Sequence, residues 1–388
     1  MIKFHLAEDT IDAKDIARLI QWLQTNPRLT KGDVTIDFQD KWSRWLGRSY
    51  SVNCNSGSSA NLLMYYALLL SGKLKNKKVI VPSVGWVTSI APAIQFGFEP
   101  VMCEADSDTF GLDLDHLESL LKEYEPSTVL MVQVLGVPHK MDAVLALKDK
   151  YGFFLLEDAC AAIGASYKGN KVGSFGDMAS FSFYFGHQMS TIEGGMVSTD
   201  DATFNNLLLM LRSHGWSKDL DGRDHQSLLK QHHIDDFHAP FVFYEPGFNL
   251  RSTDLNAFIG LVQLEKLDWM TSRRQENHAY YMQRLGDTFT VQRCEPECQV
   301  ASISFGLLAA SEGQRKQIIV ALVRNGIETR IFSAGNLGLH PFWSDRYGTT
   351  RFPMADRIHC CGLFLPNNPS LNEESLAFIS QTVLGAVQ

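Results

Sequence analysis

The chain has 388 residues, of which 45% are hydrophobic and 20% charged, and its formal net charge at pH 7 is −8. This composition is typical of a folded globular protein and excludes a disordered chain. The acidic balance argues against a nucleic acid or an anionic membrane surface as a partner, and no segment approaches the ~20 apolar residues of a membrane helix.

Between about residues 50 and 200, short apolar runs alternate with amphipathic segments. The apolar runs predict strands at 79–81, 100–103, 129–134, 153–156, 179–183 and 196–198. The amphipathic segments predict helices at 58–70, 88–96, 114–124 and 143–151. Strands and helices in alternation indicate an α/β fold with a mostly parallel sheet that is covered by helices on both faces.

The pattern changes in the last third of the chain. A polar stretch over 217–245 predicts a large loop, and a long helix begins near Thr253. Beyond it we predict strands at 300–308 and 327–331 and helices at 314–324 and 373–384. A chain of this length usually exceeds one core. We therefore expect a large domain over 1–280 and a small α+β domain over 281–388, with an N-terminal helix (about 1–25) packed on the small domain.

The seven cysteines are scattered and odd in number. This usage indicates reduced thiols in a cytoplasm rather than a disulfide framework. The N-terminal residues also lack the apolar run of a signal peptide. We therefore expect a cytoplasmic protein.

The first motif is a run of small residues at 55–60 (NSGSSA), which opens a predicted helix. Backbone N–H groups at such a helix start can bind a phosphate, although the same run can equally be a turn with a helix cap. No P-loop lysine and no G-x-G-x-x-G pattern accompanies it. A nucleoside triphosphatase or a dinucleotide dehydrogenase is therefore disfavoured.

The second motif is a predicted strand that ends in two acids, Glu157 and Asp158. Ligands of open α/β sheets bind beyond the carboxyl ends of the strands, and an aspartate there can pair with a protonated ring nitrogen. An acid at a strand end can equally cap the next segment.

The third motif is the segment 181–187 (FSFYFGH), in which a strand places Ser182 near a ligand and a turn presents His187. A lone histidine is more often a structural residue than a catalyst. Whether His187 is a structural or a catalytic residue therefore depends on the motifs around it.

Together these motifs resemble the fold-type I pyridoxal-phosphate enzymes, in particular the sugar aminotransferases that act on nucleotide-linked 4-keto-6-deoxy sugars. The resemblance covers nearly the whole chain. The matching segments are NSGSSA (55–60), PSVGWVT (82–88), EDACAAIG (157–164), RSHG (212–215), GFNLR (247–251) and GLVQL (260–264). The fold implied is a large domain with a seven-stranded, mostly parallel sheet and a small C-terminal α+β domain.

The segment 181–187 departs from the family pattern, because His187 stands where the family has its Schiff-base lysine. An imidazole cannot form an imine with an aldehyde, but it can still act as a general base. This departure resembles the 3-dehydratases of nucleotide-linked 4-keto-6-deoxy sugars. A second departure is Ala161, where the family often has Gln or His.

Two kinds of 3-dehydratase exist, and the cysteines distinguish them. One kind carries a [2Fe–2S] cluster and needs a reductase partner. A cluster requires four convergent thiolates, and no cysteine lies between Cys160 and Cys294. The chain therefore resembles the kind without an iron–sulfur cluster, which acts on a GDP-linked sugar and needs no reductase.

The resemblance implies several ligands and roles. Pyridoxal phosphate is converted by glutamate to pyridoxamine phosphate, and His187 is the catalytic base that removes a proton. Cofactor-binding roles fall to Gly57 and Ser58 (phosphate, backbone), Ser182 (phosphate, hydroxyl), Trp86 (ring stacking), Asp158 (ring nitrogen) and Asn249, which reaches the phosphate of the other subunit of a homodimer. His214 and Arg330 are candidate substrate-binding residues.

Other interpretations remain open at this stage. An aminotransferase would need a lysine at position 187. A cofactor-binding protein that lost its activity with the lysine predicts that Asp158, Trp86 and His187 share no pocket, and an iron–sulfur dehydratase predicts bound iron. The run HHIDDFH (232–238) is rich in metal-binding side chain types, but nothing fixes a ligand geometry, so we expect no metal site.

Overall fold

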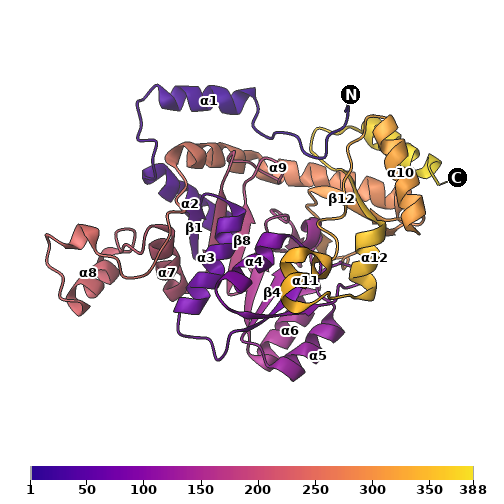
Figure 1. The fold of residues 1–388 in the computed structure, drawn as a ribbon. Helices are drawn as coiled ribbons and strands as arrows, with labels where there is room; N and C mark the ends of the chain where they lie inside the picture. Colours follow the sequence, from indigo (N-terminus) through magenta and orange to yellow (C-terminus); the bar gives the residue numbers. More distant parts are fainter. Residues whose placement is uncertain (1, 388) are drawn as a thin grey trace.

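The computed structural model describes residues 2–387. Its centre is a seven-stranded sheet in the order β1-β9-β8-β5-β4-β2-β3 (Figure 1). β2, β3, β4, β5 and β8 run parallel, whereas β9 is antiparallel to both β8 and β1. The predicted, mostly parallel sheet is confirmed. The strands are β1 (Tyr50–Cys54), β2 (Lys78–Pro82), β3 (Glu99–Cys103), β4 (Thr128–Val132), β5 (Phe154–Asp158), β8 (Met178–Ser182) and β9 (Gly195–Thr199).

Helices cover both faces of this sheet, which explains why its strands are apolar on both sides. Val79 and Val81 of β2 pack in the same core as α3 (Gly57–Leu70), α4 (Val87–Gln95) and α7 (Ala202–Arg212). Ile80, between them, faces the opposite core with α5 (Leu114–Tyr124) and α6 (Met141–Tyr151). On that same face, α2 (Asp33–Leu46) and α9 (Asp254–Leu285) cover β8 and β9.

The C-terminal part contains a second, antiparallel sheet in the order β10-β12-β13. The expected strand at 300–308 begins only at Ser304, and the strand expected at 327–331 is absent, so that prediction is wrong. This segment lies between the N-terminal residues and β13 and contacts each of them at a single position. It therefore makes only isolated bridges, from Ile327 to Phe4 and from Ile331 to Leu363. The elements are β10 (Thr290–Val291), β12 (Ser304–Leu308), α10 (Glu312–Arg324), α11 (Pro341–Tyr347), α12 (Pro353–Cys361), β13 (Gly362–Pro366) and α13 (Glu373–Gly385).

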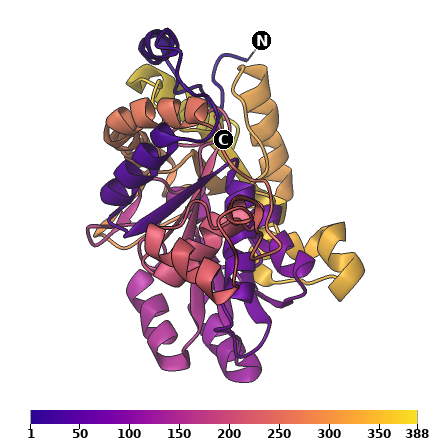
Figure 2. The same cartoon turned by 90° about the vertical axis from the view of Figure 1, so that its left-hand side faces the viewer.

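Two peripheral regions differ from the expectation. The stretch 217–245 is not only a loop, since it contains α8 (Gly222–Gln231), which is capped by the side chain of Asp221. This helix extends away from the body in Figure 1 and lies in front of the body in Figure 2. Helix α1 (Ala13–Leu23) lies on α9, where Arg18 pairs with Glu265, and the residues before it, rather than the helix, reach 326–328.

The remaining elements are short. β6 (Ser166–Tyr167), β7 (Asn170–Lys171) and β11 (Cys298–Gln299) form a small third sheet, and 3₁₀ turns lie at Val134–Gly136, Ala239–Phe241 and Leu337–Leu339. Helix α9 runs without a break through residue 280. The division at that residue therefore stays a prediction. None of the helices within 2–387 has the length and apolarity that crossing a bilayer requires.

The two acids at the end of β5 point to opposite faces of the sheet, as successive strand residues do. Glu157 is fully buried and accepts backbone hydrogen bonds from Gly173 (3.1 Å), Phe175 (2.8 Å) and Gly176 (2.5 Å). It therefore fixes the turn that leads into β8. Asp158 is left to face the opposite side, where the candidate site lies.

We predict that Glu157→Gln destabilises the protein by about 1–3 kcal/mol, because an amide nitrogen would face buried N–H donors. Urea unfolding at matched protein concentration measures this loss. Glu297→Gln is the matched control, since that side chain is 65% exposed, and it is expected to leave stability unchanged. Equal stability of Glu157→Gln and wild type would show that Glu157 does not hold the turn.

Candidate active site

A cavity of about 680 Å³ lies beyond the carboxyl ends of β2, β4, β5 and β8. Seven of the nine residues singled out in the sequence line it: Gly57, Ser58, Trp86, Asp158, Ser182, His187 and Arg330. Asn249 and His214 do not. The expectation that Asp158, Trp86 and His187 share no pocket, which belongs to the inactive-protein interpretation, is therefore wrong.

The start of α3 forms one end of the cavity. The side chain of Ser56 caps the helix by accepting the N–H of Ser59 (3.1 Å). The N–H groups of Gly57 and Ser58 lie in the first turn, where helical N–H groups have no partner within the helix. A Cβ on Gly57 would lie 2.5 Å from Cβ of Ser182 and 2.9 Å from Sγ of Cys160, so only glycine fits. This end is therefore a backbone cradle for an anion.

Asp158 is 5% exposed and its carboxylate accepts three hydrogen bonds. Oδ2 accepts from Oγ of Ser89 (2.5 Å) and Nδ2 of Asn61 (2.9 Å), and Oδ1 accepts from the N–H of Cys160 (3.1 Å). Asp158 fits both interpretations of its motif: it caps the next segment through the N–H of Cys160, and it also lines the cavity. Asn61 and Ser89 belong to none of the motifs noted in the sequence; their only signal was helical spacing, one turn after Gly57 and three residues after Trp86.

Trp86 immediately precedes α4, and its side chain is half exposed at the cavity wall. It is therefore not a core aromatic. The guanidinium carbon of Arg330 lies 5.7 Å from the centroid of its ring. Arg330 is therefore placed beside a flat aromatic face inside the cavity. Glu328, which accepts the N–H of Leu6 (2.9 Å), also lines the cavity and was missed.

His187 ends a turn that follows β8, in which its N–H donates to the carbonyl of Tyr184 (2.9 Å). Its Nδ1 is buried and has no hydrogen-bond partner among the described residues. Burial lowers the pKa of His187 to about 4, and the cations Arg274 and Arg330 act in the same direction while Asp158 opposes them. The imidazole is therefore neutral at pH 7. None of the described residues that line the cavity is a lysine.

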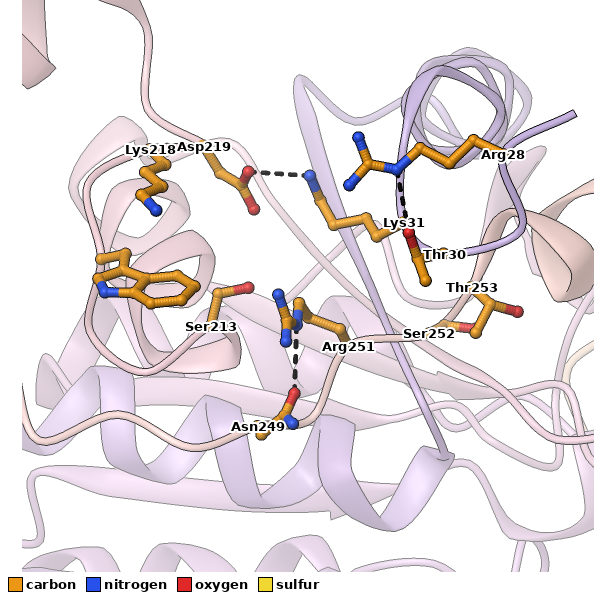
Figure 3. Close-up of a pocket in the computed structure, with 11 residues that line it drawn as sticks. Arg28, Thr30, Lys31, Ser213, Lys218, Asp219, Asn249, Arg251, Ser252 and Thr253 are labelled. Carbon is orange, nitrogen blue, oxygen red and sulfur yellow. Dashed lines mark hydrogen bonds and ion pairs between the residues drawn. The ribbon is translucent and has the colours of Figure 1, made fainter. Parts of the chain in front are cut away.

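Asn249 lines a second cavity of about 480 Å³, shown in Figure 3. Its Oδ1 accepts from Nε of Arg251 (3.1 Å). Four cationic side chains line this cavity: Arg28, Lys31, Lys218 and Arg251. Its carboxylate, Asp219, pairs with Lys31 (2.8 Å) and with Arg212 (2.7 Å). The second cavity is therefore suited to an anion.

His214 lines neither cavity. It has a positive φ of 62°, and its ring lies 4.8 Å from that of Trp216, in the wall of the second cavity. The expectation that it lines the site with His187 is not met in one chain. In the run 232–238, His238 pairs with Asp235 (2.8 Å), and both are exposed. Across residues 2–387, no three His, Cys, Asp or Glu side chains converge as a metal site would require.

The fold and the cavity agree with similarities to known proteins. A curated GDP-4-keto-6-deoxy-D-mannose 3-dehydratase from Yersinia pseudotuberculosis is 33% identical over 341 residues, which is 87% of this chain and 86% of that protein. A solved structure of an Escherichia coli GDP-4-keto-6-deoxy-D-mannose 3-dehydratase with bound hydrated PLP matches with a TM-score of 0.90 and 27% identity, covering 99% of this chain and 100% of that one.

A structure of a GDP-4-keto-6-deoxymannose 3-dehydratase with a trapped PLP–glutamate geminal diamine matches with a TM-score of 0.88 and 27% identity, covering 98% of this chain and 100% of that one. The profile of the DegT/DnrJ/EryC1/StrS aminotransferase family matches residues 9–384, which is almost the whole sequence. On this evidence, the chain belongs to the DegT/DnrJ/EryC1/StrS aminotransferase family.

Proposed function

We propose that the protein is a pyridoxal-phosphate-dependent 3-dehydratase that removes the C3 hydroxyl of GDP-4-keto-6-deoxy-D-mannose, with glutamate as the amino donor. The observation that carries this proposal is His187, a neutral imidazole in a cavity without lysine, at the position of the family's Schiff-base lysine. The named relatives support the same assignment, since one structure holds hydrated PLP and another a PLP–glutamate geminal diamine. The reduced cysteines fit a cytoplasmic enzyme.

Pyridoxal phosphate fits the residues that line the cavity. The backbone N–H groups of Gly57 and Ser58 at the start of α3 can bind its phosphate, and Ser182, which packs against Gly57, lines the cavity on the same side. Asp158 can hold the ring nitrogen in its protonated form, and the half-exposed Trp86 offers a face for the ring. When bound, the cofactor supplies an electron sink and, in its amine form, the amino group that meets the C4 ketone.

The chain itself supplies binding and proton transfer. Trp86 and Asp158 orient the ring from its face and its edge, and His187 takes the proton that must leave the reacting carbon. The same imidazole can deliver a proton to the departing C3 hydroxyl, which leaves as water. Arg330, beside Trp86, can bind the carboxylate of glutamate or a phosphate of the nucleotide. Glutamate provides the two electrons, so neither iron nor a reductase is needed.

The test of this proposal supplies pyridoxal phosphate, glutamate and GDP-4-keto-6-deoxy-D-mannose, with no reductase. We predict equal amounts of ammonia, 2-oxoglutarate and the 3-deoxy ketosugar, and a loss of all three products in His187→Asn. The products are measured by mass spectrometry and an ammonia assay. An amino sugar as product, or no turnover by the wild-type protein, would contradict the proposal.

The lowered pKa of His187 makes a pH prediction. A base with a pKa of about 4 stays neutral as the pH falls through 6.5 and becomes protonated only near its own pKa. The acidic limb of kcat/KM should therefore lie well below pH 6.5. NMR titration of the histidine signal that disappears in His187→Asn provides an independent measurement. A midpoint at or above 6.5 in both experiments would refute the assignment.

We further propose that the active enzyme is a homodimer with sites shared between subunits. Asn249 faces the second cavity rather than the cavity of His187, so it can reach the phosphate only in another copy. Exposed apolar side chains lie on two segments next to the second cavity. They are Ile16, Ile20 and Leu23 on α1, and Phe237, Phe241 and Phe243 in the stretch 217–245. A second copy would bury both sets and place the cations of the second cavity beside an anionic ligand.

Complementation between subunits tests this arrangement. His187→Asn and Asn249→Asp should each be inactive alone. Mixed subunits should recover about a quarter of the wild-type activity, because half of the dimers are hybrids and each hybrid has one intact site. Co-expression with two purification tags isolates the hybrids. Hybrid dimers without recovered activity, or an active monomer in sedimentation experiments, would contradict the shared site.

A further inference from the structure

We propose that Asn61 and Ser89 are positioning residues, which hold the carboxylate of Asp158 ionised and aimed so that a proton stays on the nitrogen of a bound pyridine ring. This inference rests on the proposed function, since it concerns the same cavity. It assigns a role to two fully buried polar side chains that no sequence motif had singled out.

The hydrogen bonds determine which part of the carboxylate is free. Oδ2 accepts from both Ser89 and Asn61, whereas Oδ1 accepts only the N–H of Cys160. An ionised carboxylate has about four acceptor positions, two on each oxygen. The Oδ2 positions are thus used by the protein, and the position left on Oδ1 is available to a donor in the cavity. A protonated ring nitrogen is a donor of this kind.

The amide of Asn61 can donate in only one orientation, and a third residue fixes that orientation. Oγ of Ser180 donates to Oδ1 of Asn61 (2.6 Å), so the amide nitrogen must face Asp158. Ser180 lies on β8, Asn61 on α3 and Asp158 on β5. The relay therefore joins three elements that surround the cavity.

The position of Asn61 on α3 supports the same role. It follows Gly57 by four residues, which is about 6 Å along a helix axis and places both residues on one face. One end of this helix face cradles an anion while the other end holds the carboxylate. A ligand with a phosphate at one end and a ring nitrogen at the other is matched by the spacing of these two contacts.

The physical effect concerns where a shared proton resides. Hydrogen bonds that a carboxylate accepts stabilise its ionised form, so the proton of a carboxylate–pyridine pair stays on the nitrogen. Without these bonds the ionised carboxylate is less stable, and the ring nitrogen holds the shared proton less strongly. A ring without that proton is a weaker electron sink.

The test uses the full-length protein loaded with pyridoxal phosphate that carries ¹⁵N in its ring. We measure the ¹⁵N chemical shift against pH in wild type, Asn61→Leu and Ser89→Ala. The pH at which the nitrogen loses its proton should fall by about one to two units in each variant, the shift expected from one hydrogen bond to a charged group. Ser180→Ala should produce a smaller shift, because it frees the Asn61 amide to rotate.

Matched controls separate this role from general stability. Asn277→Leu removes another buried amide, which donates to the carbonyl of Asn368, and Ser380→Ala removes a buried hydroxyl on α13. Both should keep the wild-type titration. If Asn61→Leu does not fold, Ser89→Ala and Ser180→Ala decide alone. A wild-type titration in these variants overturns the inference, whereas a wild-type protein that binds no cofactor overturns the proposed function and the inference with it.

Discussion

An imidazole cannot make the covalent bond that a lysine amine makes with an aldehyde, so every contact that retains the proposed cofactor must be non-covalent. The cavity must therefore hold the cofactor through several contacts of this kind. The start of α3 offers backbone N–H groups, Trp86 offers a face, and Asp158 offers a single free acceptor position. A partner subunit would add Asn249. If a lysine-containing relative lost one of these contacts, the covalent bond would still hold the cofactor. In this chain, only the remaining non-covalent contacts would hold it.

The histidine at position 187, where the family has a lysine, also determines the proposed chemistry. Burial and nearby cations hold the pKa of His187 low, so the imidazole is a neutral base at pH 7. It has no primary amine and therefore forms no imine with the cofactor aldehyde. A lysine side chain can return its proton to a distant carbon, but an imidazole on a short turn has less reach. The proposed reaction therefore ends in dehydration rather than amination on the fold of an aminotransferase family.

The sequence predicted the large sheet well because its strands are buried on both faces and read as plain apolar runs. It also predicted seven of the residues that line the cavity, through the resemblance to the family. Of these, Asp158 ends a strand of the large sheet, and Gly57 and His187 follow one. It failed at 327–331, where a strand was predicted but the segment makes only single bridges to distant segments. Asn61 was missed because a buried amide within an apolar helix carries no pattern of its own, and its meaning depends on contacts from β5 and β8.

Reduction with borohydride tests the central claim most directly. It would be applied to the wild-type protein loaded with pyridoxal phosphate, followed by measurement of the intact mass. Borohydride fixes the cofactor to a lysine amine only when the two are already joined. We predict no added mass in the wild-type protein and one added cofactor per chain in His187→Lys. A wild-type protein that gains the mass of one cofactor would contradict the account, because another lysine would then hold the ring.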